Sequence, residues 1–178
     1  MKSVFLKSIR CVAVIGLCAA SVTTANSADA AEQCLSSAEA TAEKIRRLKT
    51  TLMVGALQCD RATHLRVAES YNAFVETHGT AIQAYDNTLS QYFERVHGGN
   101  ARKMMDRHVT SLANKVATQS YRTTDFCEQV AALASASLTD APETLLAVAD
   151  QNMIAPARLK SCDTSLQKAA QALPLAEK

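Results

Sequence analysis

The longest helical pattern in the chain runs from Leu65 to Val96. Its larger side chains recur at alternating steps of four and three residues, which places them along one side of an α-helix. They are Tyr71, Val75, His78, Ile82, Tyr85, Leu89, Tyr92 and Val96. Five of the seven aromatic residues outside the first thirty positions lie in this stretch. Because aromatic side chains bury large areas, we expect an all-α fold whose other helices pack around Leu65–Val96.

The rest of the chain predicts a single disulfide-stapled bundle of five or six helices. Gly98 and Gly99 would end the long helix, and Asn100 is expected to cap the next one. Asp125 and Asp140 are each followed three positions later by a glutamate, which is a capping-box pattern. The further helices are expected at 34–59, at about 101–120, after Asp125, after Asp140 and at about 159–169.

The predicted helix at 34–59 differs from the others near its end. From Leu52 to Leu57 it is apolar all round, which indicates burial on several sides. Gly55 and Ala56 lie within this run, and two such small residues would let another helix approach closely.

The first thirty residues have the pattern of a secretory signal peptide. Three basic residues precede an uncharged run at 11–20, and the small residues Ala28-Asp29-Ala30 follow as a cleavage motif. As a helix the uncharged run is only about 15 Å long, against about 30 Å of membrane hydrocarbon. We therefore predict cleavage after Ala30, a single helical domain at 31–178 without a membrane span, and a periplasmic or secreted protein.

Charge gives no indication of a polyanionic partner. The formal net charge of +2 falls to zero when the leader is removed, because the leader takes three basic residues and one acidic residue with it. This balance favours neither nucleic acid nor an anionic membrane as a partner. The nearest approach to a basic patch is formed by Lys44, Arg46, Arg47 and Lys49, which we interpret as the solvated face of a helix.

Four cysteines remain after the leader, namely Cys34, Cys59, Cys127 and Cys162. An even number in an exported chain indicates two disulfides, and their wide spacing argues against a redox CxxC motif, haem attachment or paired-cysteine zinc ligation. A continuous helix would hold Cys34 and Cys59 about 37 Å apart, whereas a disulfide needs Cα atoms within about 7 Å. We favour Cys59–Cys127 with Cys34–Cys162, and Cys34–Cys127 with Cys59–Cys162 remains open.

Two groups of side chains are candidates for ligand binding. His78 lies in the long helical seam with Tyr71 and Tyr85 on the same side, where it would ligate haem or line a small pocket. The alternative for His78 is a core histidine that bonds a tyrosine or a backbone group. Met104 and His108 form a possible soft-ligand pair. None of these histidines has the spacing of a known metal motif, so no metal and no cofactor is predicted.

Catalytic signatures are missing from the sequence. It has no paired carboxylates in an acid–base arrangement, no GxSxG or SxxK motif and no glycine-rich phosphate loop. We therefore expect a non-enzymatic binding module of the periplasm or cell surface, such as an inhibitor, adaptor or assembly factor, with another exported or envelope protein as partner. The alternative is a small-ligand, haem or metal carrier that uses the His/Tyr seam. The same seam could also close a homodimer.

Three segments together resemble small exported bacterial helical proteins of unknown function. They are Leu52–Cys59, with the sequence LMVGALQC, Tyr71–Val75, with the sequence YNAFV, and the pair Phe126-Cys127. The resemblance implies an exported helical domain in which Cys59 and Cys127 belong to the shared framework. It implies no activity.

Overall fold

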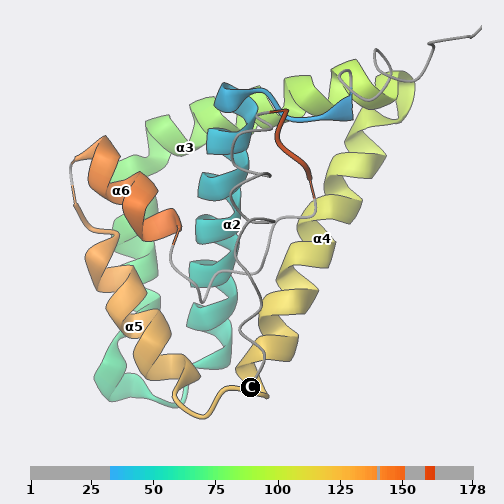
Figure 1. The fold of residues 1–178 in the computed structure, drawn as a ribbon. Helices are drawn as coiled ribbons and strands as arrows, with labels where there is room; N and C mark the ends of the chain where they lie inside the picture. Colours follow the sequence, from blue (N-terminus) through green and yellow to red (C-terminus); the bar gives the residue numbers. More distant parts are fainter. Residues whose placement is uncertain (1–32, 140, 151–158, 163–178) are drawn as a thin grey trace, which may run out of the picture.

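The computed structural model describes residues 33–139, 141–150 and 159–162, so the predicted leader lies outside the described residues. The described part is mostly helical and confirms the all-α class (Figure 1). Its five α-helices are α2 (Ser37–Gln58), α3 (Val67–His97), α4 (Ala101–Ser120), α5 (Phe126–Ala136) and α6 (Pro142–Ala149). The short 3-10 helices η1 (Thr63–Leu65) and η2 (Gly98–Asn100) precede α3 and α4. The helix count of the whole chain stays a prediction.

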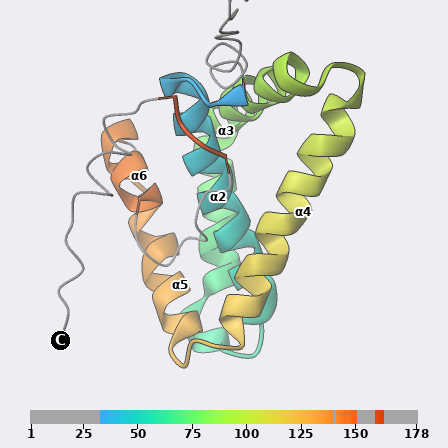
Figure 2. The same ribbon diagram turned by 45° about the vertical axis from the view of Figure 1, so that its right-hand side comes forward.

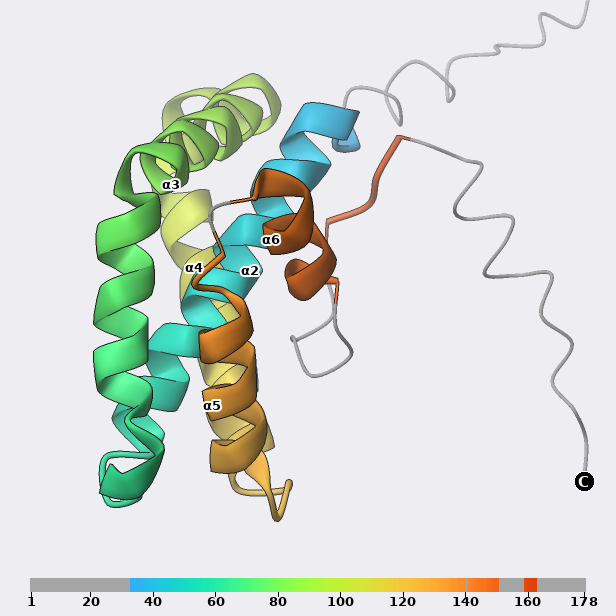
Figure 3. The same ribbon diagram turned by 90° about the vertical axis from the view of Figure 1, so that its left-hand side faces the viewer.

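Helix α2, and not α3, is the central element of the fold. It packs against α3, α4, α5 and α6, and Figures 2 and 3 show it running between the other helices. Side chains on several sides of α2 are buried, namely Ala42, Glu43, Ile45, Leu48, Thr50, Thr51, Leu52, Val54 and Gly55. The expectation that the other helices pack around Leu65–Val96 therefore holds for α2, α4 and α5, whereas α6 packs against α2 and α5. The large buried residues of α3 lie along one side of that helix. The smaller residues of α2 allow other helices to pack against it on several sides.

The close approach expected at the end of α2 occurs against α5. A Cβ atom added at Gly55 would collide with the side chain of Val130. The backbones of α2 and α5 can be this close only because position 55 carries no side chain. One residue beyond the end of α2, Cys59 is bonded to Cys127 of α5, with Cα atoms 5.6 Å apart.

The other end of α2 is held by a second disulfide. Cys34 is bonded to Cys162 with Cα atoms 5.0 Å apart, so the structure has the first of the two pairings considered above. Beside it, Leu35 and Ser161 form an isolated parallel bridge, in which the Leu35 amide donates to the Lys160 carbonyl at 2.8 Å. A helix starting at 159 is therefore wrong, because residues 159–162 are not helical and Ser161 forms the bridge, and the rest of that predicted helix lies outside the described residues.

Local signals place the helix starts correctly but not every cap. At α2 a full capping box forms, in which the Glu39 amide donates to Ser36 and the Ser36 amide donates to Glu39. Helices α4 and α5 begin directly after Asn100 and Asp125, as predicted, yet in the described residues neither side chain makes the expected capping hydrogen bond. Asp140, the other predicted cap, lies outside the described residues.

The two disulfides are typical of a protein in an oxidising compartment. Within the described ranges, no helix combines the length and the apolar character needed to cross a bilayer.

Candidate functional site

His78 is a core residue of α3. Its Nε2 atom lies 2.9 Å from the backbone oxygen of Ser137 at the end of α5, and its ring is tilted against Phe74. A carbonyl oxygen only accepts hydrogen bonds, so Nε2 carries the proton and donates. Tyr71 and Tyr85 are half-buried against the core, and each is seven residues, or about 10 Å along the helix, from His78. The three side chains are therefore spread along α3, and His78 has the backbone-bonded geometry of a core histidine.

His108 of α4 has a different partner from the one expected. Its Nε2 atom donates to Oε2 of Glu43 on α2 at 2.9 Å, and both side chains are buried. Met104 is half-buried and packs against a small hydrophobic cluster formed by Leu35, Ala42, Leu89, Tyr92 and Phe93. His108 is thus paired with a carboxylate rather than with a sulfur atom. In the described part of the chain, no three His, Cys, Asp or Glu residues gather as metal ligands would.

Glu43 is a buried carboxylate that the sequence pattern does not reveal. It lies off the apolar stripe of α2, where a helix with one buried side would expose it to water. Because α2 is covered on several sides, Glu43 is only 1% exposed, and its Oε1 atom has no hydrogen-bond partner among the described residues.

The cations of α2 are not a solvated face, which corrects the interpretation above. Arg46 pairs with Asp86 of α3, Lys49 approaches the same carboxylate at 3.3 Å, and Lys44 pairs with Asp150 at 2.9 Å. The Arg46 side chain is only 13% exposed. Burial lowers the pKa of Arg47, while the charges of nearby carboxylates oppose that change. Lys44, Arg46 and Lys49 are thus paired within the molecule by carboxylates from neighbouring helices.

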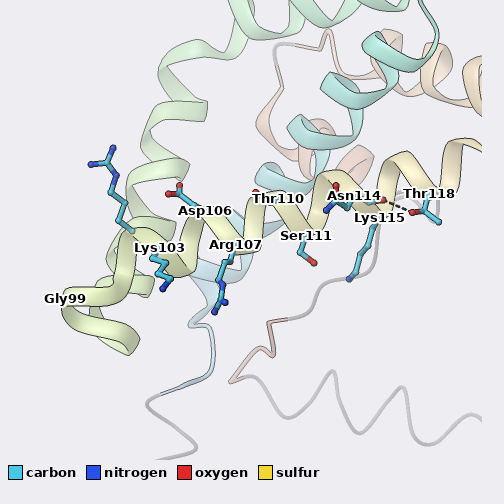
Figure 4. A pocket seen from close by; sticks show the side chains of 10 residues that line it. Gly99, Lys103, Asp106, Arg107, Thr110, Ser111, Asn114, Lys115 and Thr118 are labelled. Carbon is cyan, nitrogen blue, oxygen red and sulfur yellow. Dashed lines mark hydrogen bonds between the residues drawn. The ribbon is translucent and has the colours of Figure 1, made fainter.

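The outward side of α4 carries an open polar surface. A hollow of about 910 Å³ lies along it (Figure 4). We call the residues that line it the α4 outer face: Gly99, Arg102, Lys103, Asp106, Arg107, Thr110, Ser111, Asn114, Lys115 and Thr118. The opposite side of α4 packs into the core through Leu112 and Val116, which are almost fully buried. One side of the helix thus anchors it, and the other presents charged and hydrogen-bonding groups.

The α4 outer face has four cations and a single carboxylate, Asp106. Among the described residues, no ion pair includes Arg102, Lys103 or Arg107. Arg102 and Lys103 lie in the first turn of α4, where the helix dipole disfavours positive charge, and no acidic residue lies in that turn. Ion pairs within the described part of the chain therefore do not account for these cations.

Tyr121 extends the α4 outer face at its C-terminal end. It follows Thr118 by three residues, so it lies on the same side of the helix, and it is 81% exposed. The sequence signal for this surface is the excess of cations within 101–120. That signal is hidden when charge is summed over the whole chain.

The groups on the α4 outer face are of kinds that bind other molecules. Arg and Lys donate charge-assisted hydrogen bonds to carboxylates, hydroxyl and amide side chains donate and accept, and an exposed tyrosine supplies apolar contact area. Comparison of the chain with family models, with curated proteins and with solved structures finds no match.

Proposed function

We propose that this protein is an exported, non-enzymatic interaction module whose contact surface is the α4 outer face together with Tyr121. Its partner is another exported or envelope protein. The observation that carries the proposal is the group of cations Arg102, Lys103 and Arg107, which have no ion-pair partner within the described residues, whereas three of the four cations of α2 are paired. Arg and Tyr are also the residue types that contribute most to protein interfaces.

The scaffold under this surface supports recognition of a folded partner. Helix α4 packs through its apolar side against α2 and α3, and disulfides hold both ends of α2. A surface on a rigid, packed helix loses little conformational entropy when it binds. This favours an inhibitor, adaptor or assembly factor over a flexible tail that folds on binding.

The location of the protein follows from the leader pattern and the disulfides taken together. We propose that cleavage after Ala30 releases one bundle of five or six helices, 31–178, into the periplasm or the cell exterior. Two disulfides in a chain of this size fit an oxidising compartment. The resemblance to small exported bacterial proteins agrees with this proposal and adds no activity to it.

The carrier alternative has no observation in its favour and stays a prediction. The Nε2 atoms of His78 and His108 are both engaged, with a carbonyl and a carboxylate respectively. A homodimer through the α3 seam is also not part of the proposal, because Tyr92 of that seam is buried within the chain and donates to the Gln33 carbonyl.

Site-specific photocrosslinking in the organism that encodes the protein tests the proposal. A photoreactive amino acid replaces Thr110 on the α4 outer face or, as the control, the exposed Thr63 of η1. We expect a protein adduct from position 110 and none from position 63. Mass spectrometry then identifies the partner, and binding is measured with the two purified, disulfide-bonded proteins.

The binding measurement decides whether the adduct reflects a specific surface. Arg107→Glu is expected to weaken binding about tenfold or more, because it places a repulsive charge on the contact surface. Arg61→Glu makes the same charge change on an exposed residue outside α4 and is expected to leave affinity unchanged. No adduct at position 110, or equal effects of the two substitutions, would overturn the proposed function.

A further inference from the structure

The positive charges of the α4 outer face are arranged in a row. Figure 4 shows Lys103, Arg107, Ser111 and Lys115 along one edge of the helix, at steps of four residues. This row contains cations and a hydroxyl but no carboxylate. The neighbouring row holds Arg102 and Asp106, so negative charge on the face is confined to one position near its N-terminal end.

The two ends of the surface differ in chemistry. Lys103 and Arg107 lie one helical turn apart, about 6 Å, at the N-terminal end. Tyr121 lies at the other end, about 27 Å from Lys103 along the helix axis. A partner segment that covers both ends therefore needs acidic groups at one end and an apolar contact at the other.

We infer that the α4 outer face binds a carboxylate-rich segment of its protein partner, lying along α4, with acidic residues against Lys103 and Arg107 and an apolar site around Tyr121. This inference rests on the proposed function and specifies the chemistry of the partner. The segment spans about 27 Å, which corresponds to about eighteen residues of α-helix or about eight of extended chain. The difference between the two ends fixes one direction of the segment along α4.

The packing of α4 favours a protein segment over a membrane as the bound partner. A helix that lies on a membrane inserts its apolar side into the lipid. The apolar side of α4 is occupied in the core, where Leu112 and Val116 are 1% exposed, so only a polar row and one tyrosine remain outside. Thr110, Ser111 and Asn114 both donate and accept hydrogen bonds, as the polar groups of a peptide segment require.

A charge-exchange experiment tests this inference on the partner identified by crosslinking. The double variant Lys103→Glu/Arg107→Glu is expected to lose about tenfold or more in affinity, and Glu→Lys or Asp→Lys changes in the crosslinked partner segment are expected to restore most of it. Affinity of the unchanged pair is expected to fall as salt is raised, because salt screens the charges between the two surfaces. Arg61→Glu serves again as the control, and circular dichroism checks that each variant is folded.

The possible failures are distinguishable. A partner that crosslinks at position 110 but contacts α4 through neutral segments, or shows no charge-exchange rescue, overturns the inference and leaves the proposed function standing. The absence of any protein adduct overturns both. Binding to phosphatidylcholine vesicles only when they contain phosphatidylglycerol, lost in the double variant, would assign the surface to a membrane and also overturn the inference.

Discussion

Helices α2 and α4 have similar length and the same number of cations, yet their charges have opposite fates. The cations are Lys44, Arg46, Arg47 and Lys49 in α2, and Arg102, Lys103, Arg107 and Lys115 in α4. In α2, carboxylates from α3 and from the end of α6 neutralise three of them. On α4, three of the four have no such pair among the described residues. The comparison teaches that the neighbours of a helix, and not its composition, decide whether its charges serve stability or binding.

The same contrast holds for buried polar atoms that lack a hydrogen-bond partner. Glu43 Oε1, Arg46 Nε and Thr51 Oγ1 are the buried side-chain atoms without hydrogen-bond partners in the described residues, and all three belong to α2. Crowding around α2 therefore makes its polar residues sensitive to change. The outer face of α4 should tolerate substitution without loss of stability.

The largest expected effect is that of Glu43→Ala. It leaves the buried Nε2–H of His108 without an acceptor and creates a cavity, which should cost about 3 kcal/mol in the free energy of unfolding. Denaturant unfolding of the disulfide-bonded protein measures it. Asp106→Ala is the matched change on α4 and should cost less than about 0.5 kcal/mol. Equal losses would break the comparison between the two helices.

A second prediction concerns the close contact between α2 and α5. Gly55→Ala should destabilise the protein by about 1–3 kcal/mol, because the new methyl group overlaps Val130. The double variant Gly55→Ala/Val130→Ala should lose less than the sum of the single losses. Gly79→Ala, in an open position of α3, should stabilise by about 0.5–1 kcal/mol. A stabilising Gly55→Ala would contradict the central, crowded position of α2.

Removal of one cation from α2 and one from α4 compares directly how much each contributes to stability. Arg46→Met takes away the mostly buried partner of Asp86 and should cost about 1 kcal/mol, a value kept small because Lys49 still approaches that carboxylate. Arg107→Met on α4 should change the free energy of unfolding by less than about 0.5 kcal/mol. Thermal unfolding of the two variants side by side makes the measurement, and a larger effect at Arg107 would count against its assignment to binding.

The smallest effect is expected at the start of α2. Burial raises the pKa of Glu39, but hydrogen bonds from Arg95 and Ser36, together with the charge of Arg95, outweigh it and hold the pKa below its ordinary value. Glu39 therefore contributes stability above the ordinary glutamate pKa of about 4.3, and this contribution is lost as the pH falls through the lower folded-state pKa.

The contribution of Glu39 is about 0.5 kcal/mol, because Arg95 is partly exposed and solvent screens the pair. Stability curves measured between neutral and acid pH should show Glu39→Gln less stable than the unchanged protein at pH 7. The two should converge as the pH falls below the folded-state pKa of Glu39. A difference that persists or grows in acid would refute the assignment.

Much of the local structure could be predicted from the sequence. The start of α4 after Asn100, the start of α5 after Asp125 and the end of α3 at the glycine pair all depend on residues within a few positions of one another. Helix periodicity and capping act over three or four residues, so the sequence displays them directly. The same local argument excluded a Cys34–Cys59 bond, since one continuous helix separates these two residues, but only the fold chose between the two remaining pairings.

The candidate site could not be predicted in the same way. The sequence left His78 as either a ligand or a core histidine, because its partner, the Ser137 carbonyl, is 59 positions away. The basic cluster of α2 looked solvated because Asp86 and Asp150 lie 37 and 106 positions from the lysines they contact. The cations of the α4 outer face differ from those of α2 only in the folded chain, where carboxylates of other helices pair with Lys44, Arg46 and Lys49.

The sequence by itself thus determined which segments become helices, where they begin and which cysteines could meet. The tertiary structure alone decided that α2 lies at the centre, that Glu43 and His108 are buried together, and that α4 keeps its cations at the surface. The physical reason is range: helix formation is set by neighbours along the chain, whereas burial and ion pairing depend on which helices pack together.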